Sequence, residues 1–370
     1  MVGLRVALSL GLCLALCAAC SRTQPRDAQT PATPSTPPEP PAAPPPPPDP
    51  RIAQGAELYG RMCAVCHGES GEGYKADQAP ALAQPDFLAS ATDNYLGFTI
   101  AEGRAGTTMS AWYKGAGGPL SFDEIRALIV FMRTWQKTPS VTLDEAKPRG
   151  DSTRGQAIFD KQCAQCHGPT APNIRIMGRQ LLGRASTGFL RHALHTGRPP
   201  TTMPSFTQTL GEDGIEDVLS YLRTLPANDP KEPVGGSRPP PLPLGPVPLN
   251  PKGREPKGFK TFPAMTSVDI VGPELAKKRR MVLLDARVPS DYEHEHIAGA
   301  VSVPFYDPSP YLEDLPKDAW LVCYCGCPHA ESGALATKLL AAGFKQVTVL
   351  DEGLFAWQDR GYPMAHGTEP

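Results

Sequence analysis

The sequence predicts a multidomain protein, in which two all-α domains are followed by one α/β domain with a parallel sheet. Two observations predict this fold class. A pattern of cysteines, glycines and helix-spaced apolar residues occurs twice, over residues 51–137 and 150–226, and strand-like and helix-like segments alternate over residues 260–366. Proline-rich segments at 20–50 and 227–259 are expected to be linkers, because proline interrupts both helices and sheets.

One short motif occurs in each of the first two regions, as Cys63-Ala64-Val65-Cys66-His67 and as Cys163-Ala164-Gln165-Cys166-His167. Two thiols three positions apart can each form a thioether with one porphyrin, and the adjacent histidine then binds the iron from one side. A redox disulfide or half of a zinc site does not explain why a histidine follows the second cysteine both times. Each copy therefore predicts one covalently attached haem c, so we expect two haems and their iron.

The motif lies within a longer repeat. Gly55 and Gly155 precede the two motifs at the same distance, and a helix-like apolar stretch follows each motif, at 125–132 and 215–222. This order of features resembles class I cytochrome c domains. In that family a helix carries the cysteines, a loop carries an axial methionine, and a C-terminal helix packs across the first.

The resemblance implies a set of iron ligands. His67 and His167 match the proximal ligands of the family, and Met109 and Met203, which each follow a pair of threonines, match the sixth ligands. A thioether favours ferrous iron and fills the sixth position, so electron transfer is favoured over oxygen chemistry or a dihaem peroxidase. Five other side chains are alternative sixth ligands: Met62, Met132, Met177, His192 and His195.

The N-terminal segment has the features of an export signal. Residues 1–19 contain one basic residue, Arg5, and an apolar run that is short for a membrane-spanning helix. The small residues before Cys20 resemble a bacterial lipoprotein cleavage site, which implies that Cys20 carries lipid, although Cys17 stands where an aliphatic residue is usual. Cleavage without lipidation and an uncleaved anchor are the alternatives. We therefore expect a bacterial lipoprotein anchored on the extracytoplasmic, periplasmic side of a membrane.

Composition adds two constraints. The formal net charge of -2 and the charged fraction of 20% give no basic field, so we expect no nucleic-acid partner. Of the 27 residues at 24–50, 13 are proline, which favours an extended polyproline spacer. Seven of the ten cysteines lie in the N-terminal segment and the two motifs, and the other three are Cys323, Cys325 and Cys327.

The C-terminal region predicts a parallel α/β sheet. Residues 282–287, 320–325 and 346–350 have the pattern of buried strands, and a helix-like stretch at 332–342 follows the second. Chemistry in such sheets occurs at the carboxyl ends of strands, where a helix N-terminus offers its N–H groups to an anion. Cys325 occupies that place, which favours a thiolate and a bound persulfide.

Four stretches carry a resemblance to a known family: Leu284-Asp285-Ala286-Arg287, His296-Ile297-Ala298-Gly299-Ala300, Ala342-Gly343-Phe344 and Asp351-Glu352-Gly353-Leu354-Phe355-Ala356-Trp357. They resemble the rhodanese domain over about residues 262–366. In that family a loop cysteine takes up sulfane sulfur as a persulfide and passes it to a thiol or to cyanide. The resemblance implies that Cys325 has this role, and that Asp285 and Arg287 are structural residues at a strand end.

The loop after Cys325 departs from the family's pattern. It is one residue longer than usual, lacks the arginine and contains Glu331, so thiosulfate is held less well, and His329 is the nearby potential cation. Cys327 could resolve a persulfide or form a disulfide with Cys323 or Cys325 in an oxidising compartment. A catalytically silent module for docking or redox sensing is therefore the alternative.

The predicted function combines these modules. We predict a membrane-anchored dihaem c-type cytochrome that transfers electrons to redox partner proteins of an extracytoplasmic respiratory chain. Because Cys325 shares the chain with two haem-attachment motifs, we expect chemistry on a small sulfur compound to be coupled to this electron transfer. The alternative is a pure electron carrier whose C-terminal domain is silent.

Overall fold

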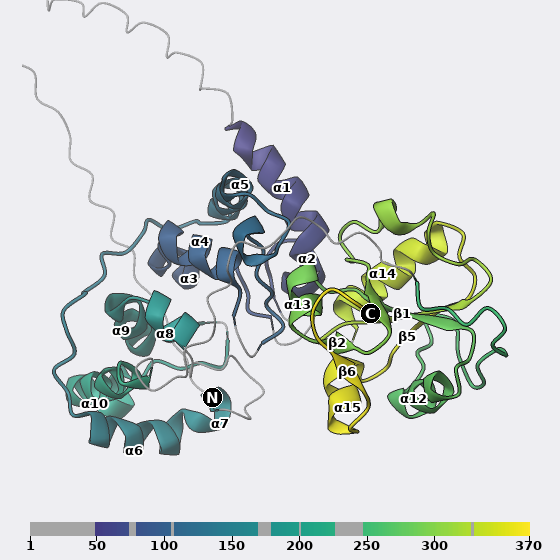
Figure 1. Cartoon of the computed structure of the whole chain (residues 1–370). Coiled ribbons are helices and arrows are strands. Elements are labelled where there is room, and N and C mark those ends of the chain that lie inside the picture. The colour runs from purple at the N-terminus through teal and green to yellow at the C-terminus, as the bar shows by residue number, and fades with distance from the viewer. Residues whose placement is uncertain are drawn as a thin grey trace, which may run out of the picture. The chain divides into compact units, whose positions relative to one another are not determined.

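The computed structural model describes residues 49–73, 79–104, 107–168, 179–199, 201–225, 247–326 and 329–370 (Figure 1). Pro48–Pro370 form one compact unit. The expected lipidation site Cys20, the alternative ligand Met177 and the loop cysteine Cys327 lie outside the described residues. Within the described ranges, no helix is both long enough and apolar enough to cross a membrane.

The first helical domain is held together by a crossing of its first and last helices. Its elements are α1 (Pro50–Met62), α2 (Ala64–His67), α3 (Pro85–Ser90), α4 (Asp93–Glu102), η1 (Lys114–Ala116) and α5 (Phe122–Arg133). Helix α5 begins with a capping box in which Ser121 and Glu124 bond each other's backbone N–H groups. Helix α1 contacts α5 closely at Gly55, where a Cβ would lie 2.1 Å from the carbonyl oxygen of Ala127. The glycine therefore permits the crossing.

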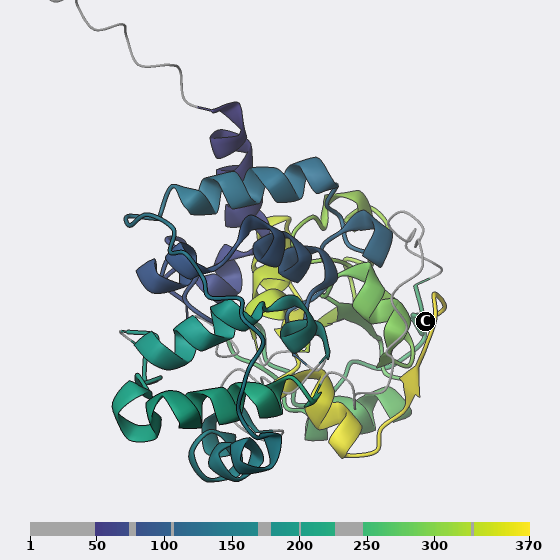
Figure 2. The same ribbon diagram turned by 90° about the vertical axis from the view of Figure 1, so that its left-hand side faces the viewer.

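The second helical domain repeats this crossing. Its elements are α6 (Ser152–Gln162), α7 (Ala164–His167), α8 (Arg179–Arg184), α9 (Thr187–Thr196) and α10 (Thr207–Leu222). Helices α6 and α10 lie side by side in both views (Figure 1, Figure 2). A Cβ at Gly155 would lie 1.9 Å from the carbonyl oxygen of Asp217, so the repeated glycine has the same packing role in both domains. Helix α10 begins earlier than the apolar stretch predicted at 215–222. It bends at Gly211, which has a φ of 62°.

A buried ion pair in the second domain predicts a pH-dependent stability. Arg191 Nε donates to Glu216 Oε1 at 2.8 Å, and the backbone N–H of Arg149 donates to Oε2 of the same carboxylate at 2.9 Å. The hydrogen bond from Arg191 holds the pKa of Glu216 below its usual value. We therefore expect Glu216→Gln to lower the free energy of unfolding at pH 7 by about 1.5–3 kcal/mol.

The sign of the pH dependence follows from the lowered pKa of Glu216. The Glu216 carboxylate stabilises the fold at every pH above the ordinary pKa of a glutamate. This stabilisation is lost as the pH falls through the lowered pKa that Glu216 has in the folded state. Calorimetric unfolding of wild type and Glu216→Gln should therefore converge as the buffer is acidified from pH 7. Glu212→Gln on the same helix is the control, because the Glu212 side chain is 73% exposed. Equal unfolding temperatures for wild type and Glu216→Gln at pH 7 would contradict the prediction.

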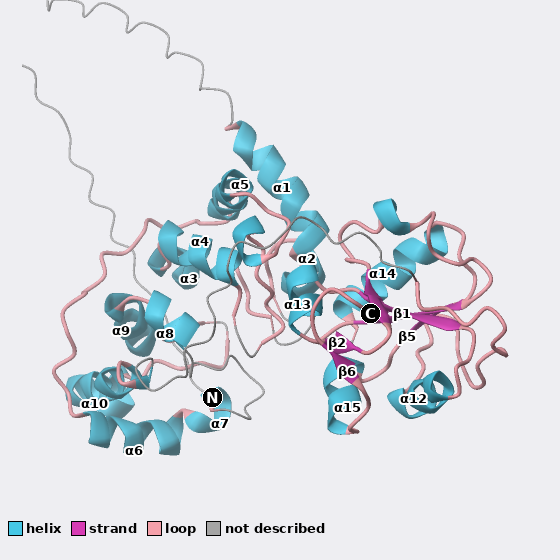
Figure 3. Cartoon of the chain, viewed as in Figure 1, coloured by secondary structure: helices cyan, strands magenta, loops and turns pink. Residues whose placement is uncertain are grey.

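The C-terminal domain is built on a four-stranded parallel sheet (Figure 3). The strands lie in the order β3 (Ala300–Ser302), β1 (Met281–Asp285), β4 (Trp320–Tyr324) and β5 (Val347–Val349). Leu283 in β1 is paired with Ala300 on one side and with Val322 on the other. Every residue of β1 is buried, as expected for a parallel strand covered on both faces.

Helices and a small second sheet complete the C-terminal domain. These elements are α12 (Val268–Ala276), α13 (Pro289–His294), β2 (His296–Ile297), η2 (Ser309–Tyr311), α14 (Ala330–Ala341), α15 (Gly353–Asp359) and β6 (Met364–Ala365). Helix α14 packs against β4 and β5, and β2 pairs with β6 in an antiparallel ladder. The chain that leaves the carboxyl end of β4 therefore enters the N-terminus of α14. The predicted fold class, two all-α domains followed by an α/β domain with a parallel sheet, is confirmed.

The contacts of the C-terminal domain begin within the second proline-rich segment. Asn250 Nδ2 donates to the carbonyl oxygen of Lys278 at 2.7 Å, and the backbone N–H of Arg280 donates to the carbonyl oxygen of Arg254 at 3.0 Å. Trp320 Nε1 also donates to Glu255 Oε2 at 3.1 Å. The end of the segment is thus attached to the edge of the domain.

Candidate functional site

The first cysteine motif forms a helical corner between α1 and α2. The backbone N–H of Cys63 donates to the carbonyl oxygen of Tyr59 at 2.8 Å, and the carbonyl oxygen of Cys63 accepts from the backbone N–H of His67 at 2.9 Å. Cys66 lies on the same turn of α2. One turn of helix therefore carries both thiols and the imidazole, which is what attachment of a porphyrin and ligation of its iron require.

The second motif repeats this corner between α6 and α7. The backbone N–H of Cys163 donates to the carbonyl oxygen of Phe159 at 2.8 Å, and the backbone N–H of His167 donates to the carbonyl oxygen of Cys163 at 2.9 Å. Burial raises the pKa of Cys163 to about 11 and that of Cys63 to about 12. Redox CxxC motifs instead have lowered thiol pKa values, so the thiol chemistry here does not favour a redox disulfide.

The surroundings of His67 determine which ring nitrogen can bind a metal. The residue is 8% exposed, and its Nδ1 lies 2.9 Å from the carbonyl oxygen of Pro80. Because a carbonyl oxygen can only accept a hydrogen bond, Nδ1 carries the proton and Nε2 keeps its lone pair. Burial also lowers the pKa of His67, which favours the neutral ring. A neutral imidazole with Nε2 unprotonated is the form that binds iron.

The two predicted methionine ligands lie in loops of the same construction. The backbone N–H of Arg104 donates to the carbonyl oxygen of Met109 at 2.8 Å, and the backbone N–H of Arg198 donates to that of Met203 at 3.0 Å. The glycine before each arginine has a positive φ, and a Cβ there would lie 2.4 Å and 2.7 Å, respectively, from the methionine carbonyl oxygen. Both methionine side chains are partly buried against the apolar core.

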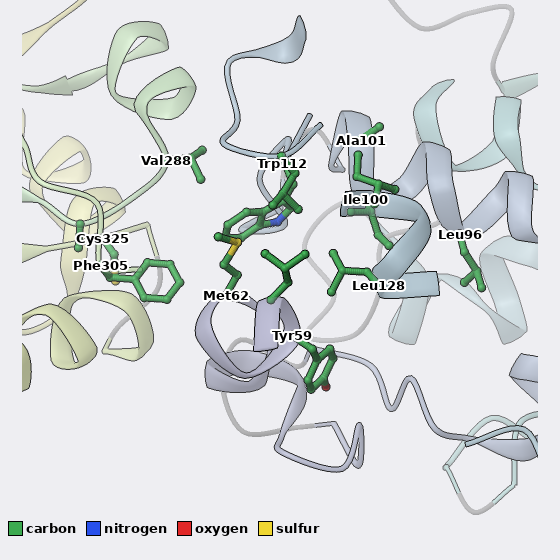
Figure 4. Packing of buried hydrophobic residues seen from close by; sticks show 14 of the residues in the cluster. Tyr59, Met62, Leu96, Ile100, Ala101, Trp112, Leu128, Val288, Phe305 and Cys325 are labelled. Carbon is green, nitrogen blue, oxygen red and sulfur yellow. The ribbon is translucent and has the colours of Figure 1, made fainter. Parts of the chain in front are cut away.

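The alternative ligands that the structure describes have other contacts. His192 Nε2 lies 2.7 Å from Asp86 Oδ1, and His195 Nε2 lies 3.6 Å from Glu212 Oε2. The alternative methionines are core residues with at most 4% exposure: Met62, which Figure 4 shows among buried apolar side chains, and Met132. These contacts favour the loop methionines as the sixth ligands.

The donor chemistry at both corners fits a c-type haem. Each corner offers two thiols for thioether bonds and one imidazole nitrogen, and each domain offers one thioether sulfur. The residues that would hold the first haem are Cys63, Cys66, His67 and Met109, and those that would hold the second are Cys163, Cys166, His167 and Met203.

The predicted sulfur site lies where β4 leads into α14. Cys325 is fully buried, its Sγ donates to Ser332 Oγ at 3.3 Å, and its carbonyl oxygen accepts from the backbone N–H of Leu354 at 3.0 Å. Ser332 lies in the first turn of α14, so the thiol of Cys325 lies beside the N-terminus of a 12-residue helix. The helix dipole favours negative charge at this position, as a persulfide needs.

Asp285 and Arg287 form a structural pair beside this site. Arg287 donates to Asp285 Oδ2 from Nη2 at 2.6 Å and to the carbonyl oxygen of Glu295 at 2.6 Å. These bonds fix the end of β1, and the Arg287 side chain lies beside the loop after Cys325, where its Cδ would be 3.7 Å from a Cβ at Gly326. His329 lies 3.6 Å from a carboxylate oxygen of Asp351, so the loop's own potential cation faces an acidic side chain.

Two hydrogen bonds at these sites were not predicted from the sequence. The first joins Ser332 to Cys325, and a hydroxyl residue in the first turn after a nucleophile loop is the signal that could have indicated it. The second runs from Tyr59 Oη to the carbonyl oxygen of Gly68 at 2.7 Å, and it braces the turn that follows His67. Both depend on side-chain direction, which the spacing of residues does not specify.

Comparison with known proteins identifies the modules. The family model described as cytochrome c oxidase, cbb3-type, subunit III matches residues 50–132 and 150–222, and the model of the rhodanese-like domain matches residues 273–360. The chain belongs to the cytochrome c and rhodanese-like families. The two helical domains are therefore cytochrome c domains, which bind haem c covalently, and the α/β domain is a rhodanese-like domain.

Relatives match the modules separately. Subunit FixP of the cbb3-type cytochrome c oxidase of Bradyrhizobium diazoefficiens is 31% identical over 186 residues, covering 47% of this chain and 60% of that subunit. The cytochrome c-553-like protein of Synechocystis is 39% identical over 80 residues, covering 21% of this chain and 71% of that protein. Thiosulfate sulfurtransferase GlpE of Coxiella burnetii is 35% identical over 85 residues, covering 23% of this chain and 78% of that enzyme.

Each match covers only part of this chain and only part of the relative. The chain spans 62% of the cbb3-type subunit CcoP of an Azospirillum strain, at 25% identity over 195 residues and 47% of this chain. A solved rhodanese-like domain from Anabaena is 28% identical, with a TM-score of 0.26, and the match covers 28% of this chain and 78% of that one. Each of these matches covers less than half of this chain.

Proposed function

We propose that this protein is a membrane-anchored dihaem c-type cytochrome that transfers electrons in an extracytoplasmic respiratory chain. The observation that carries the proposal is the repeated helical corner, in which the first cysteine joins two helices and its carbonyl oxygen binds the histidine N–H in both domains. The match to subunits of cbb3-type oxidases supports a respiratory redox partner. The anchor is the lipid expected on Cys20.

The residues of each cytochrome domain have distinct tasks. The cysteines attach the haem, the histidine and the methionine bind its iron, and Pro80 holds the ring of His67 in the required tautomer. When bound, the haem supplies reversible one-electron chemistry at a potential that a methionine ligand raises. A methionine in the sixth position leaves no open site for substrate, so the domains act as electron carriers.

The rhodanese-like domain carries sulfane sulfur on Cys325 in this proposal. The thiolate attacks the outer sulfur of a donor, so that one S–S bond forms and another breaks, and the rest of the donor leaves with the electron pair of the broken bond. Ser332 holds the sulfur of Cys325 at the N-terminus of α14. Oxidation of the bound sulfane sulfur, with water as the source of oxygen, would release an oxyanion of sulfur, return the Cys325 thiol and release electrons, for which the same chain provides one-electron carriers.

A reduction assay tests the proposed function. The haem-loaded protein is oxidised, mixed anaerobically with thiosulfate or polysulfide, and followed through the absorbance of its haems. We expect reversible titration of two haems with a chemical reductant, and reduction by at least one sulfur compound. Reversible titration without reduction by sulfur compounds would leave a pure carrier with a silent rhodanese-like domain. Failure to titrate two haems would contradict the dihaem proposal itself.

A further inference from the structure

The sulfur site and the first cytochrome domain meet within the compact unit Pro48–Pro370. The loop between α4 and η1 of that domain carries Met109 and is called the methionine loop below. Ser110 in this loop donates from Oγ to Asp291 Oδ2 on α13 at 2.6 Å. Ser110 is 6% exposed, so this bond is largely removed from water. Hydrogen bonds to a carboxylate are among the stronger ones in proteins, and this one holds the methionine loop against the rhodanese-like domain.

Aromatic side chains form a second contact between these two domains. The ring centroid of Trp112 lies 6.4 Å from that of Phe305 and 5.8 Å from that of Tyr306. Trp112 is 6% exposed and Phe305 is 1% exposed. Figure 4 shows Trp112 on one side of this packing and Phe305 with Cys325 on the other, all within one buried apolar cluster. Water is thus excluded from the contact between the domains.

The methionine loop also reaches the loop after Cys325. A Cβ placed at Gly326 would lie 3.7 Å from Cγ2 of Thr108, which is van der Waals distance. Thr108 directly precedes Met109, and Gly326 directly follows Cys325. The methionine loop therefore packs against the loop that begins at Cys325, which is itself 0% exposed.

We propose that the first cytochrome domain forms one wall of the Cys325 site, and that this wall limits the size of the compounds that reach the thiol, so that short polysulfides are admitted and larger thiols are excluded. The proposal rests on the proposed role of Cys325 as the sulfur carrier and limits its donors by size. The Cys325 thiolate takes the outer sulfur of the polysulfide. One S–S bond forms, one breaks, and the polysulfide leaves one sulfur shorter with the electron pair, so no further oxidant is needed.

Alkylation of Cys325 by reagents of two sizes tests the wall. The haem-loaded full chain carrying Cys327→Ser is treated with iodoacetamide or with fluorescein maleimide, and the labelled Cys325 peptide is measured by mass spectrometry. The rate of labelling at Cys325 is divided by the rate at which the same reagent labels free glutathione. We expect fluorescein maleimide to be strongly disfavoured. Ser110→Ala should raise its rate by about tenfold or more, because a hydrogen bond to a charged partner is lost.

A matched serine provides the control for Ser110. Ser205 lies in the methionine loop of the second cytochrome domain, where its Oγ donates to the carbonyl oxygen of His195 in the same domain. Ser205→Ala should leave the labelling of Cys325 unchanged. Asp291→Asn, which keeps the shape of the acceptor and removes its charge, should give an intermediate rate. Equal normalised rates for the two reagents in the otherwise unaltered chain would overturn the proposal.

Alkylation reports access to the thiol even if sulfur compounds reduce no haem, so the two proposals fail separately.

Discussion

Replacing Cys63 and Cys66 together with serine is expected to lower the covalently bound haem from two per chain to one. A serine hydroxyl cannot form the thioether bonds that attach the porphyrin, so the first domain loses its haem altogether. The backbone bonds of Cys63 do not involve its side chain, and serine keeps them. The remaining haem should be the one on the second motif. Pyridine haemochrome absorbance, divided by protein mass, measures the change.

The reciprocal pair is the control for this prediction. Cys163→Ser with Cys166→Ser should also leave one haem, and replacement of all four cysteines should leave none. Haem staining after denaturing electrophoresis separates covalent from non-covalent binding, because a haem held only by iron ligands is released. Two covalent haems in either double variant would contradict the assignment of one haem to each motif. The two single-haem proteins would then also give the reduction potential of each domain separately.

The haem corners could be predicted from sequence because their geometry is local. Cys63, Cys66 and His67 lie within five positions, and a helix places residues at such spacings on one turn whatever the rest of the chain does. The parallel sheet was predictable for a related reason, since buried apolar strands such as 282–287 alternate with a helix. The bounds differed by a few residues because helix ends depend on caps, as at Ala330, where α14 begins two residues before the predicted start.

Contacts between distant segments could not be predicted in this way. Ser110 and Asp291 are 181 positions apart, and neither has a neighbour in sequence that indicates the other. The pairing of His192 with Asp86 likewise depends on tertiary structure, and it bears on which residue can bind the second haem. Both partners of the buried pair of Asp285 and Arg287 could be predicted from the sequence, because they are two positions apart at the end of one strand.

We expect Cys325→Ser to slow reduction of the haems by a sulfur compound by about a hundredfold or more. The thiolate is the nucleophile that takes the sulfur, and a serine hydroxyl beside Ser332 cannot replace it at neutral pH. Reduction by ascorbate should remain unchanged, because it does not require the sulfur site. Stopped-flow absorbance of the haems, with each reductant in excess, gives both rates for wild type and variant.

Cys323 offers a matched control for Cys325. It lies two residues earlier on β4, is also fully buried, and burial raises its pKa well above the usual value for a thiol. A protonated thiol inside the sheet is a poor nucleophile, so Cys323→Ser should keep sulfur-dependent reduction within a fewfold of wild type. If Cys325→Ser and wild type reduce at the same rate with every sulfur compound, electrons reach the haems without Cys325. The rhodanese-like domain would then act on this chain only through its contact with the first cytochrome domain.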